Sequence, residues 1–118
     1  RPTVAEYLEK CSDELKNRYE NLKQFLLNLG DDVQFKELDR YFAFKRIKNF
    51  ASMKFQPQSN TIVVWVNLDL KKVKLEKGFT KDVTNIGHHG TGNIEITIKD
   101  DFDLEKAKPY LIKSYEGS

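Results

Sequence analysis

Residues 40–68 read RYFAFKRIKNFASMKFQPQSNTIVVWVNL, and this stretch decides the fold. Apolar residues alternate with polar ones, and a period of two residues is typical of β-strands. A possible tight turn at Lys48-Asn49 and a break at residues 57–60 divide the stretch. It therefore predicts three consecutive strands, at residues 41–47, 50–56 and 61–68.

The alternation assigns these side chains to two faces of a sheet. We expect the core face to carry Phe42, Phe44, Ala51, Met53, Phe55, Ile62, Val64, Val66 and Leu68. We expect the outer face to carry Tyr41, Lys45, Phe50, Ser52, Lys54, Gln56, Val63 and Trp65.

The same stretch is rich in bases and aromatic residues and contains no acid. Its five bases are Arg40, Lys45, Arg46, Lys48 and Lys54, and six aromatic residues accompany them. The whole chain has a net charge of only +2, so the remainder holds 15 bases against 18 acids. A basic, aromatic sheet on a mildly acidic body is therefore expected, a combination that suits a nucleic-acid backbone and its bases.

Two helices are predicted before the strands. Thr3 and Glu6 have the spacing of a capping box and open a short helix over residues 4–10. A longer helix is predicted at about 12–29 from an apolar stripe with a period of three and four residues, followed by Gly30 as a left-handed C-cap.

The remaining elements follow the strands. Phe79, Val83 and Ile86 have helical spacing and predict a short helix between two glycines. Residues 93–99 predict a fourth strand. Asp103 is expected to cap a last helix, which Pro109 should kink or divide.

These elements predict a single compact α+β domain over residues 1–118, with the order α-β-β-β-α-β-α. We expect a mostly antiparallel sheet backed by the N- and C-terminal helices. The single cysteine, Cys11, fits a reducing cytoplasm, and no apolar run is long enough to span a membrane. The start at Arg1-Pro2 suggests a fragment, and we expect it to be the C-terminal part of a longer protein.

Four landmarks carry a resemblance to a known family: YFAFKRIKNFA at 41–51, GFTKDVTNIGHHGTG at 78–92, NIEITI at 93–98 and DLEKAKPYL at 103–111. In these the chain resembles an uncharacterised bacterial domain family often labelled "predicted transport protein". Members often form the C-terminal part of restriction-related proteins. The resemblance implies an accessory module, whereas the chain has neither a membrane segment nor a Walker-type phosphate loop to support transport.

The expected element order is also similar to that of a double-wing DNA-binding domain from a phage transcription activator. In that domain a saddle-shaped sheet meets the DNA. The similarity concerns element order alone, and a shared fold does not imply a shared function.

Candidate binding residues lie on the outer face of the predicted strands. Phosphate contacts are expected from the lysines and arginine of this face, and base stacking from its aromatic rings. The candidates are Tyr41, Lys45, Arg46, Lys48, Phe50, Lys54 and Trp65. Two alternatives stay open, namely that a loop or helix buries Tyr41 and Trp65, or that these rings anchor a protein partner.

The segment HHGTG at 88–92 is a second candidate, as a polar binding rim formed by His88, His89, Gly90 and Gly92. It follows a predicted helix, whereas phosphate loops precede one. Adjacent histidines without nearby carboxylates or cysteine do not make a metal site. The simplest interpretation is a turn in which an imidazole caps helix carbonyls, and acid–base catalysis is the least favoured alternative.

We therefore expect a non-enzymatic accessory module without cofactor or metal, which binds nucleic acid through this sheet face. The alternative function is a protein-docking or dimerisation module that uses the same face.

Overall fold

The computed structural model describes residues 2–118 and shows an antiparallel sheet with helices packed on one face. Two helices come first, α1 (Val4–Lys10) and α2 (Asp13–Leu27), and α3 (Asp101–Glu116) comes last. The strands are β1 (Gln34–Glu37), β2 (Phe42–Lys45), β3 (Asn49–Gln56), β4 (Thr61–Val66), β5 (Thr80–Asp82) and β6 (Ile94–Ile98), and 3₁₀ turns cover Pro57–Ser59 and Leu70–Lys72. The sheet order is β1-β2-β3-β4-β6-β5, and every neighbouring pair is antiparallel. The predicted α+β class is confirmed.

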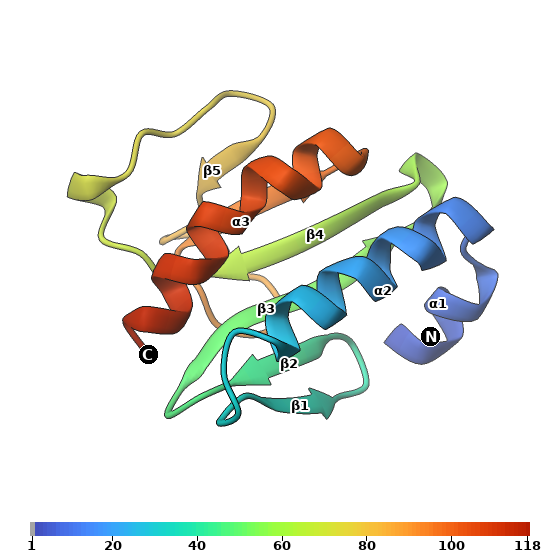
Figure 1. The fold of residues 1–118 in the computed structure, drawn as a ribbon. Helices are drawn as coiled ribbons and strands as arrows, with labels where there is room; N and C mark the ends of the chain where they lie inside the picture. The colour runs from blue at the N-terminus through green and yellow to red at the C-terminus, as the bar shows by residue number, and fades with distance from the viewer. Residues whose placement is uncertain (1) are drawn as a thin grey trace.

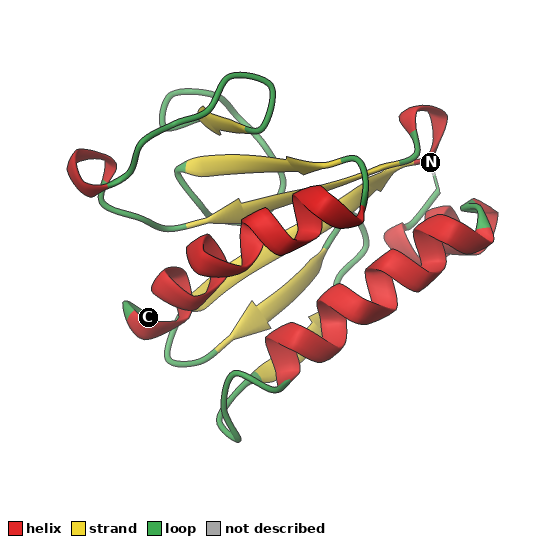
Figure 2. Cartoon of the chain, turned by 45° about the horizontal axis from the view of Figure 1, so that its top comes forward, coloured by secondary structure: helices red, strands yellow, loops and turns green. Residues whose placement is uncertain are grey.

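The sheet and the two long helices form two layers, with α2 and α3 lying side by side across one face (Figures 1 and 2). The core lies between these layers. It contains Leu15, Tyr19, Leu22 and Leu26 of α2, the inward side chains of β2, β3, β4 and β6, and Leu104, Ala107 and Leu111 of α3. Burying such a surface is the main force that holds helices to a sheet.

The helices begin where local capping chemistry starts them. Thr3 and Glu6 form the predicted capping box at α1, and the Ser12 side chain accepts a hydrogen bond from the Leu15 amide at α2. For α3 the cap is Asp100 rather than Asp103, because the Asp100 carboxylate accepts from the Asp103 amide. The helix continues through Pro109 to Glu116, so Pro109 does not divide it, and a kink at this residue stays a prediction.

Gly30 was expected to end the second helix in a left-handed conformation, and it does not. The helix ends at Leu27, and its C-cap is Asn28 in a right-handed conformation. The positive-φ glycines of the described chain are Gly78, Gly90 and Gly92. A Cβ atom at Gly30 would clash with the Tyr115 hydroxyl. A glycine therefore fits here because Tyr115 packs against its backbone.

The predicted helix at residues 79–86 is wrong. Thr80–Asp82 forms β5, which pairs with β6 at the far edge of the sheet. The three apolar residues do not share a face: Phe79 joins the helix-side core, Val83 joins a cluster with Val63 and Trp65, and Ile86 is 50% exposed. The three residues therefore have the spacing of a helical face in the sequence without forming one in the structure.

β1 was not predicted, because it is a four-residue edge strand in which only Phe35 is even partly buried. The observed order is α-α-β-β-β-β-β-β-α. The similarity to the double-wing order depended on a helix after the third strand, and that helix is absent from the described chain.

Candidate nucleic-acid interface

A loop covers much of the outer face of the sheet, which was the expected binding surface. Trp65 points to this face but is only 2% exposed. The His88 imidazole stacks on the indole with ring centroids 4.8 Å apart, and Val63 and Val83 complete the cluster. The indole of Trp65 therefore presents no open face to a nucleic-acid base.

The HHGTG segment forms this cover, and its glycines explain how it lies so close. Gly90 and Gly92 have φ angles of 76° and 142°, which residues with a side chain rarely adopt. A Cβ atom at Gly90 would lie 2.6 Å from Ser52 Cβ, and one at Gly92 would lie 2.9 Å from Trp65 Cβ. The segment rests directly on the sheet, so the expectation that it caps a helix is wrong.

The His88 ring is held by the loop itself. Its Nδ1 lies 3.0 Å from the His89 carbonyl oxygen, and its Nε2 lies 2.9 Å from the Gly92 carbonyl oxygen. Within residues 2–118, His, Cys, Asp and Glu side chains do not gather in a group of three that could hold a metal ion. His88 is thus positioned as part of the cover over Trp65.

Phe50 was expected on the outer face, and this assignment is wrong. The β2–β3 register shifts after Phe44↔Ala51, so that Lys45 pairs with Asn49 and Phe50 is the extra residue of a β-bulge. The bulge turns the Phe50 ring into the helix-side core, where it meets Tyr115 edge to face. Its ring is 1% exposed.

Arg46 and Lys48 lie apart from Lys45 and Lys54. The Arg46 guanidinium donates to the Asp32 carboxylate at 2.8 Å and to the Tyr115 carbonyl oxygen at 3.3 Å, and it covers the Tyr115 ring. Lys48 lines a hollow beside the C-terminal end of α3. These two bases therefore do not belong to the same surface.

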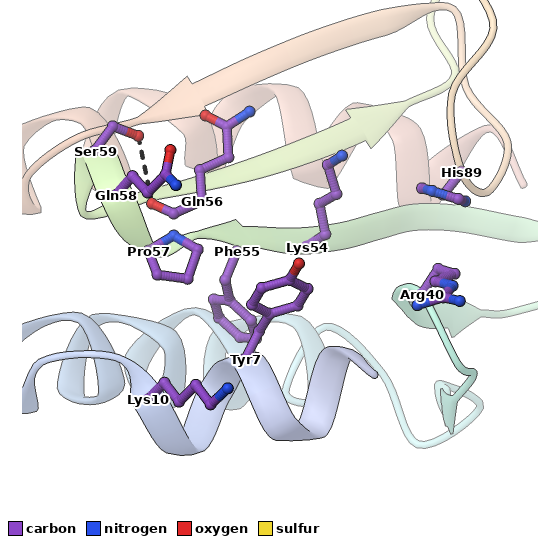
Figure 3. Close-up of a pocket in the computed structure, with 10 residues that line it drawn as sticks. All are labelled: Tyr7, Lys10, Arg40, Lys54, Phe55, Gln56, Pro57, Gln58, Ser59 and His89. Carbon is purple, nitrogen blue, oxygen red and sulfur yellow. Dashed lines mark hydrogen bonds between the residues drawn. The ribbon is translucent and has the colours of Figure 1, made fainter. Parts of the chain in front are cut away.

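Three cations meet in a hollow of about 630 Å³ between α1 and the end of β3 (Figure 3). Lys10, Arg40 and Lys54 line it, and His89 reaches it from the loop. Its other lining residues are Tyr7, Phe55, Gln56, Pro57, Gln58 and Ser59, so no acid is among the described residues that line it. We call this the α1 hollow.

A second hollow of about 370 Å³ lies over the edge strands β1 and β2. Lys36, Tyr41 and Lys45 line it together with Gln34, Phe35, Leu38, Ala43 and Asn49, and again none of the described lining residues is acidic. Tyr41 follows Arg40 of the first hollow, and its ring passes next to Gly90. Arg40 and Tyr41 are thus neighbours in the chain that line different hollows. We call the five cations Lys10, Arg40, Lys54, Lys36 and Lys45 the basic track.

The five track cations form no ion pairs with carboxylates, a property that they share with most other lysines of the described chain. Among residues 2–118, Arg18, Arg46, Lys106 and Lys108 form ion pairs with carboxylates, and none of the five track residues does. Arg40 instead donates to the Pro2 carbonyl oxygen at 2.7 Å, and the Lys54 ammonium lies 5.8 Å from the centre of the Trp65 ring. The described lining of both hollows is therefore basic and without acids, a surface that attracts anions.

A family model described as "Domain of unknown function (DUF5655)" matches residues 4–118. The chain belongs to this family. It is also 34% identical over 101 residues to an "Uncharacterized protein" of Haemophilus influenzae, a match that covers 86% of this chain and 33% of that protein. The chain thus spans about a third of the length of this relative. No solved structure matches significantly.

Neither description assigns the DUF5655 domain an activity, a ligand or a partner, so a restriction-related setting stays an expectation from the sequence. No helix in the described part of the chain is long and apolar enough to cross a membrane.

Sequence reasoning identified part of this site in the DUF5655 domain and missed the rest. Tyr41, Lys45 and Lys54 lie on the basic track or line one of its hollows, as does His89. Tyr7, Lys10 and Lys36 were missed, because they lie outside the acid-free stretch and reach the surface through tertiary packing. For Lys36 a signal existed at residues 33–36, VQFK, where apolar and polar residues alternate as in a strand.

Proposed function

We propose that this domain is a non-enzymatic accessory module that binds nucleic acid along the basic track. The observation that carries the proposal is a set of five cations, unpaired with carboxylates in the described chain, in the linings of two hollows whose described residues include no acid. Lysine and arginine neutralise backbone phosphates, and this contact supplies most of the affinity of sequence-independent binding.

The spread of these cations favours a polymer over a small anion. Three of them line one hollow and two line another, so they cannot all converge on one phosphate. A chain of phosphates can contact them in turn. The resemblance to domains of restriction-related proteins agrees with DNA as the polymer.

The surface suits nucleic acid better than a protein partner. Docking by large apolar anchors would need exposed rings, and Trp65, the largest ring expected to anchor a partner, is buried. The net charge of +2 is modest, so we expect affinity in the micromolar range at physiological salt, as for sequence-independent binding.

The test is the salt dependence of binding, measured by anisotropy with a labelled oligonucleotide. Each phosphate contact contributes about one unit to the slope of log affinity against log salt. Lys36→Ala and Lys54→Ala should therefore each reduce the slope by about one. Lys77→Ala is the charge-matched control, because Lys77 is exposed on the loop before β5, outside both hollows, and should leave the slope unchanged.

Two outcomes would contradict the proposal. One is the absence of binding to DNA and RNA at about 50 mM salt. The other is binding that persists at about 0.5 M salt, where screening shortens electrostatic reach to a few ångströms; this would favour a docking module instead.

A further inference from the structure

The α1 hollow has two chemically different ends. Figure 3 shows Arg40, Lys54 and His89 at one end, and Gln56, Gln58 and Ser59 at the other. Tyr7 lies between them, Pro57 lies at the glutamine end, and Lys10 lies along α1 toward the same end. Arg40 and Lys54 thus lie on one side of the Tyr7 ring and the amides on the other, with Lys10 as a further cation on the amide side.

The Tyr7 ring is the exposed aromatic group of this hollow, with 38% of its surface accessible. The helix that carries it is short but firmly held. Its capping box closes the first turn, Val4 is buried, and the Val4 amide donates to the Asp39 carbonyl oxygen at 2.6 Å. Arg40 also binds the Pro2 carbonyl oxygen. Tyr7 is therefore an accessible ring in a fixed position, which reduces the entropy lost when a ligand stacks on it.

We infer that the α1 hollow holds one unstacked nucleotide, an inference that rests on the proposed function and adds a ligand class to it. The base lies against the Tyr7 ring, and its phosphate faces Arg40 and Lys54. The amides of Gln56 and Gln58 carry both donors and acceptors, so they suit the polar edge of a base.

The size of the hollow agrees with this ligand. A volume of about 630 Å³ lies within the range of pockets that enclose small organic molecules, and a lone phosphate would leave most of it empty. A nucleotide in a duplex is stacked on both faces and cannot reach the ring. The site should thus prefer a single strand over a duplex, as do binders that combine cations with aromatic platforms.

Single-stranded DNA, single-stranded RNA and a free nucleoside monophosphate share this chemistry. The experiment therefore measures anisotropy with dT and rU oligomers and a blunt duplex, and calorimetric binding of AMP. The variants are Tyr7→Ala, and Tyr7→Phe, which keeps the ring and removes the hydroxyl. Unchanged melting temperatures establish that both variants fold.

Tyr7→Ala should weaken single-strand binding on the order of tenfold without changing the salt slope, because stacking releases no counterions. Tyr7→Phe should stay within about twofold of the wild type if the contact is stacking. The wild-type protein should bind the duplex more weakly than the single strand, and Tyr7→Ala should not change its affinity for the duplex. As a second measurement, a photo-crosslinking 4-thiothymidine oligomer should attach to a peptide from residues 4–10 or 54–59 of the wild type.

The outcomes separate the two proposals. Equal binding of single strand and duplex, unaffected by Tyr7→Ala while the lysine variants still lower the salt slope, overturns the nucleotide pocket and leaves the proposed function standing. AMP binding that depends on Tyr7, without binding of any polymer, supports the pocket and overturns the proposed function. Absence of binding to all four ligands overturns both.

Discussion

The indole of Trp65 and the imidazole of His88 lie face to face, with ring centroids 4.8 Å apart and planes 8° from parallel. The indole Nε1 donates to the Glu95 carboxylate at 3.2 Å on the neighbouring strand. The Trp65 indole is thus covered by His88 on one face and held by Glu95 through its ring nitrogen. This relationship closes the part of the sheet face around Trp65, which the sequence suggested was open.

The first prediction concerns this stack. His88→Ala should uncover the indole, shift its fluorescence to longer wavelength and increase quenching by acrylamide. The signal belongs to Trp65 alone, because the chain has one tryptophan. Stability should fall by about 0.5–1.5 kcal/mol, the usual contribution of an aromatic pair. Asn85→Ala, at an exposed position of the same loop, is the control and should change neither property. An unchanged spectrum in His88→Ala would show that the stack does not shield Trp65.

The second prediction concerns the glycines of the loop. Gly90→Ala should lower the free energy of unfolding by roughly 2 kcal/mol or more, because a positive φ angle and a contact with Ser52 both oppose a side chain. Gly87→Ala is the matched control, since no heavy atom lies within 4 Å of its Cβ position. Urea denaturation measures both. Equal effects of the two substitutions would mean that the loop does not rest on the sheet.

The third prediction tests the packing of α2 on the sheet. Leu22 is completely buried in the core, and Leu22→Ala should cost about 2–5 kcal/mol. Ile47→Ala removes a similar side chain that is 74% exposed, so it should change stability by less than about 0.5 kcal/mol. A cost below about 1 kcal/mol for Leu22→Ala in denaturant titrations would refute this helix-to-sheet packing.

The fourth prediction concerns acid stability. The Tyr115 hydroxyl and the Arg46 guanidinium donate to the Asp32 carboxylate at 2.7 and 2.8 Å, and they lower the pKa of Asp32 below its ordinary value of 3.8. A lowered folded-state pKa stabilises the fold above the ordinary value, and this contribution is lost as the pH falls through the folded-state pKa.

Asp32→Asn should therefore lower the melting temperature at pH 6, and the difference from the wild type should shrink between about pH 4 and pH 2. The effect should be small, because the Asp32 side chain is 51% exposed and solvent screens the pair. Asp31→Asn serves as the neighbouring control. A difference that stays constant from pH 6 to pH 2 would exclude this titration as the cause.

Several elements could be predicted because their signals are local. The capping box at Thr3 and Glu6 and the apolar stripe of α2 act within one or two helical turns. The alternation in residues 41–68 is likewise a property of neighbouring residues. Phe25 shows the limit of such a pattern: its spacing places it on the apolar stripe, yet it is only partly buried, beneath the Lys108 ammonium.

The candidate site was predicted only in part. Charge along the chain identified Arg40, Lys45 and Lys54 as part of a basic surface. It could not show that Arg46 turns to Asp32 and Tyr115, because these partners are 14 and 69 residues away. Nor could it bring Tyr7 and Lys10 beside Lys54, which requires α1 to pack against β3.

The sequence by itself determined the α+β class, the long helix, the central strands and the excess of positive charge around them, because these depend on periodicity and composition. Tertiary structure decided which faces stay open. A bulge moved Phe50 into the core, and a glycine loop covered Trp65. Both events depend on contacts between segments that are distant in the chain, and these contacts supply the free energy that stabilises them. Such contacts leave no periodic pattern in the local sequence.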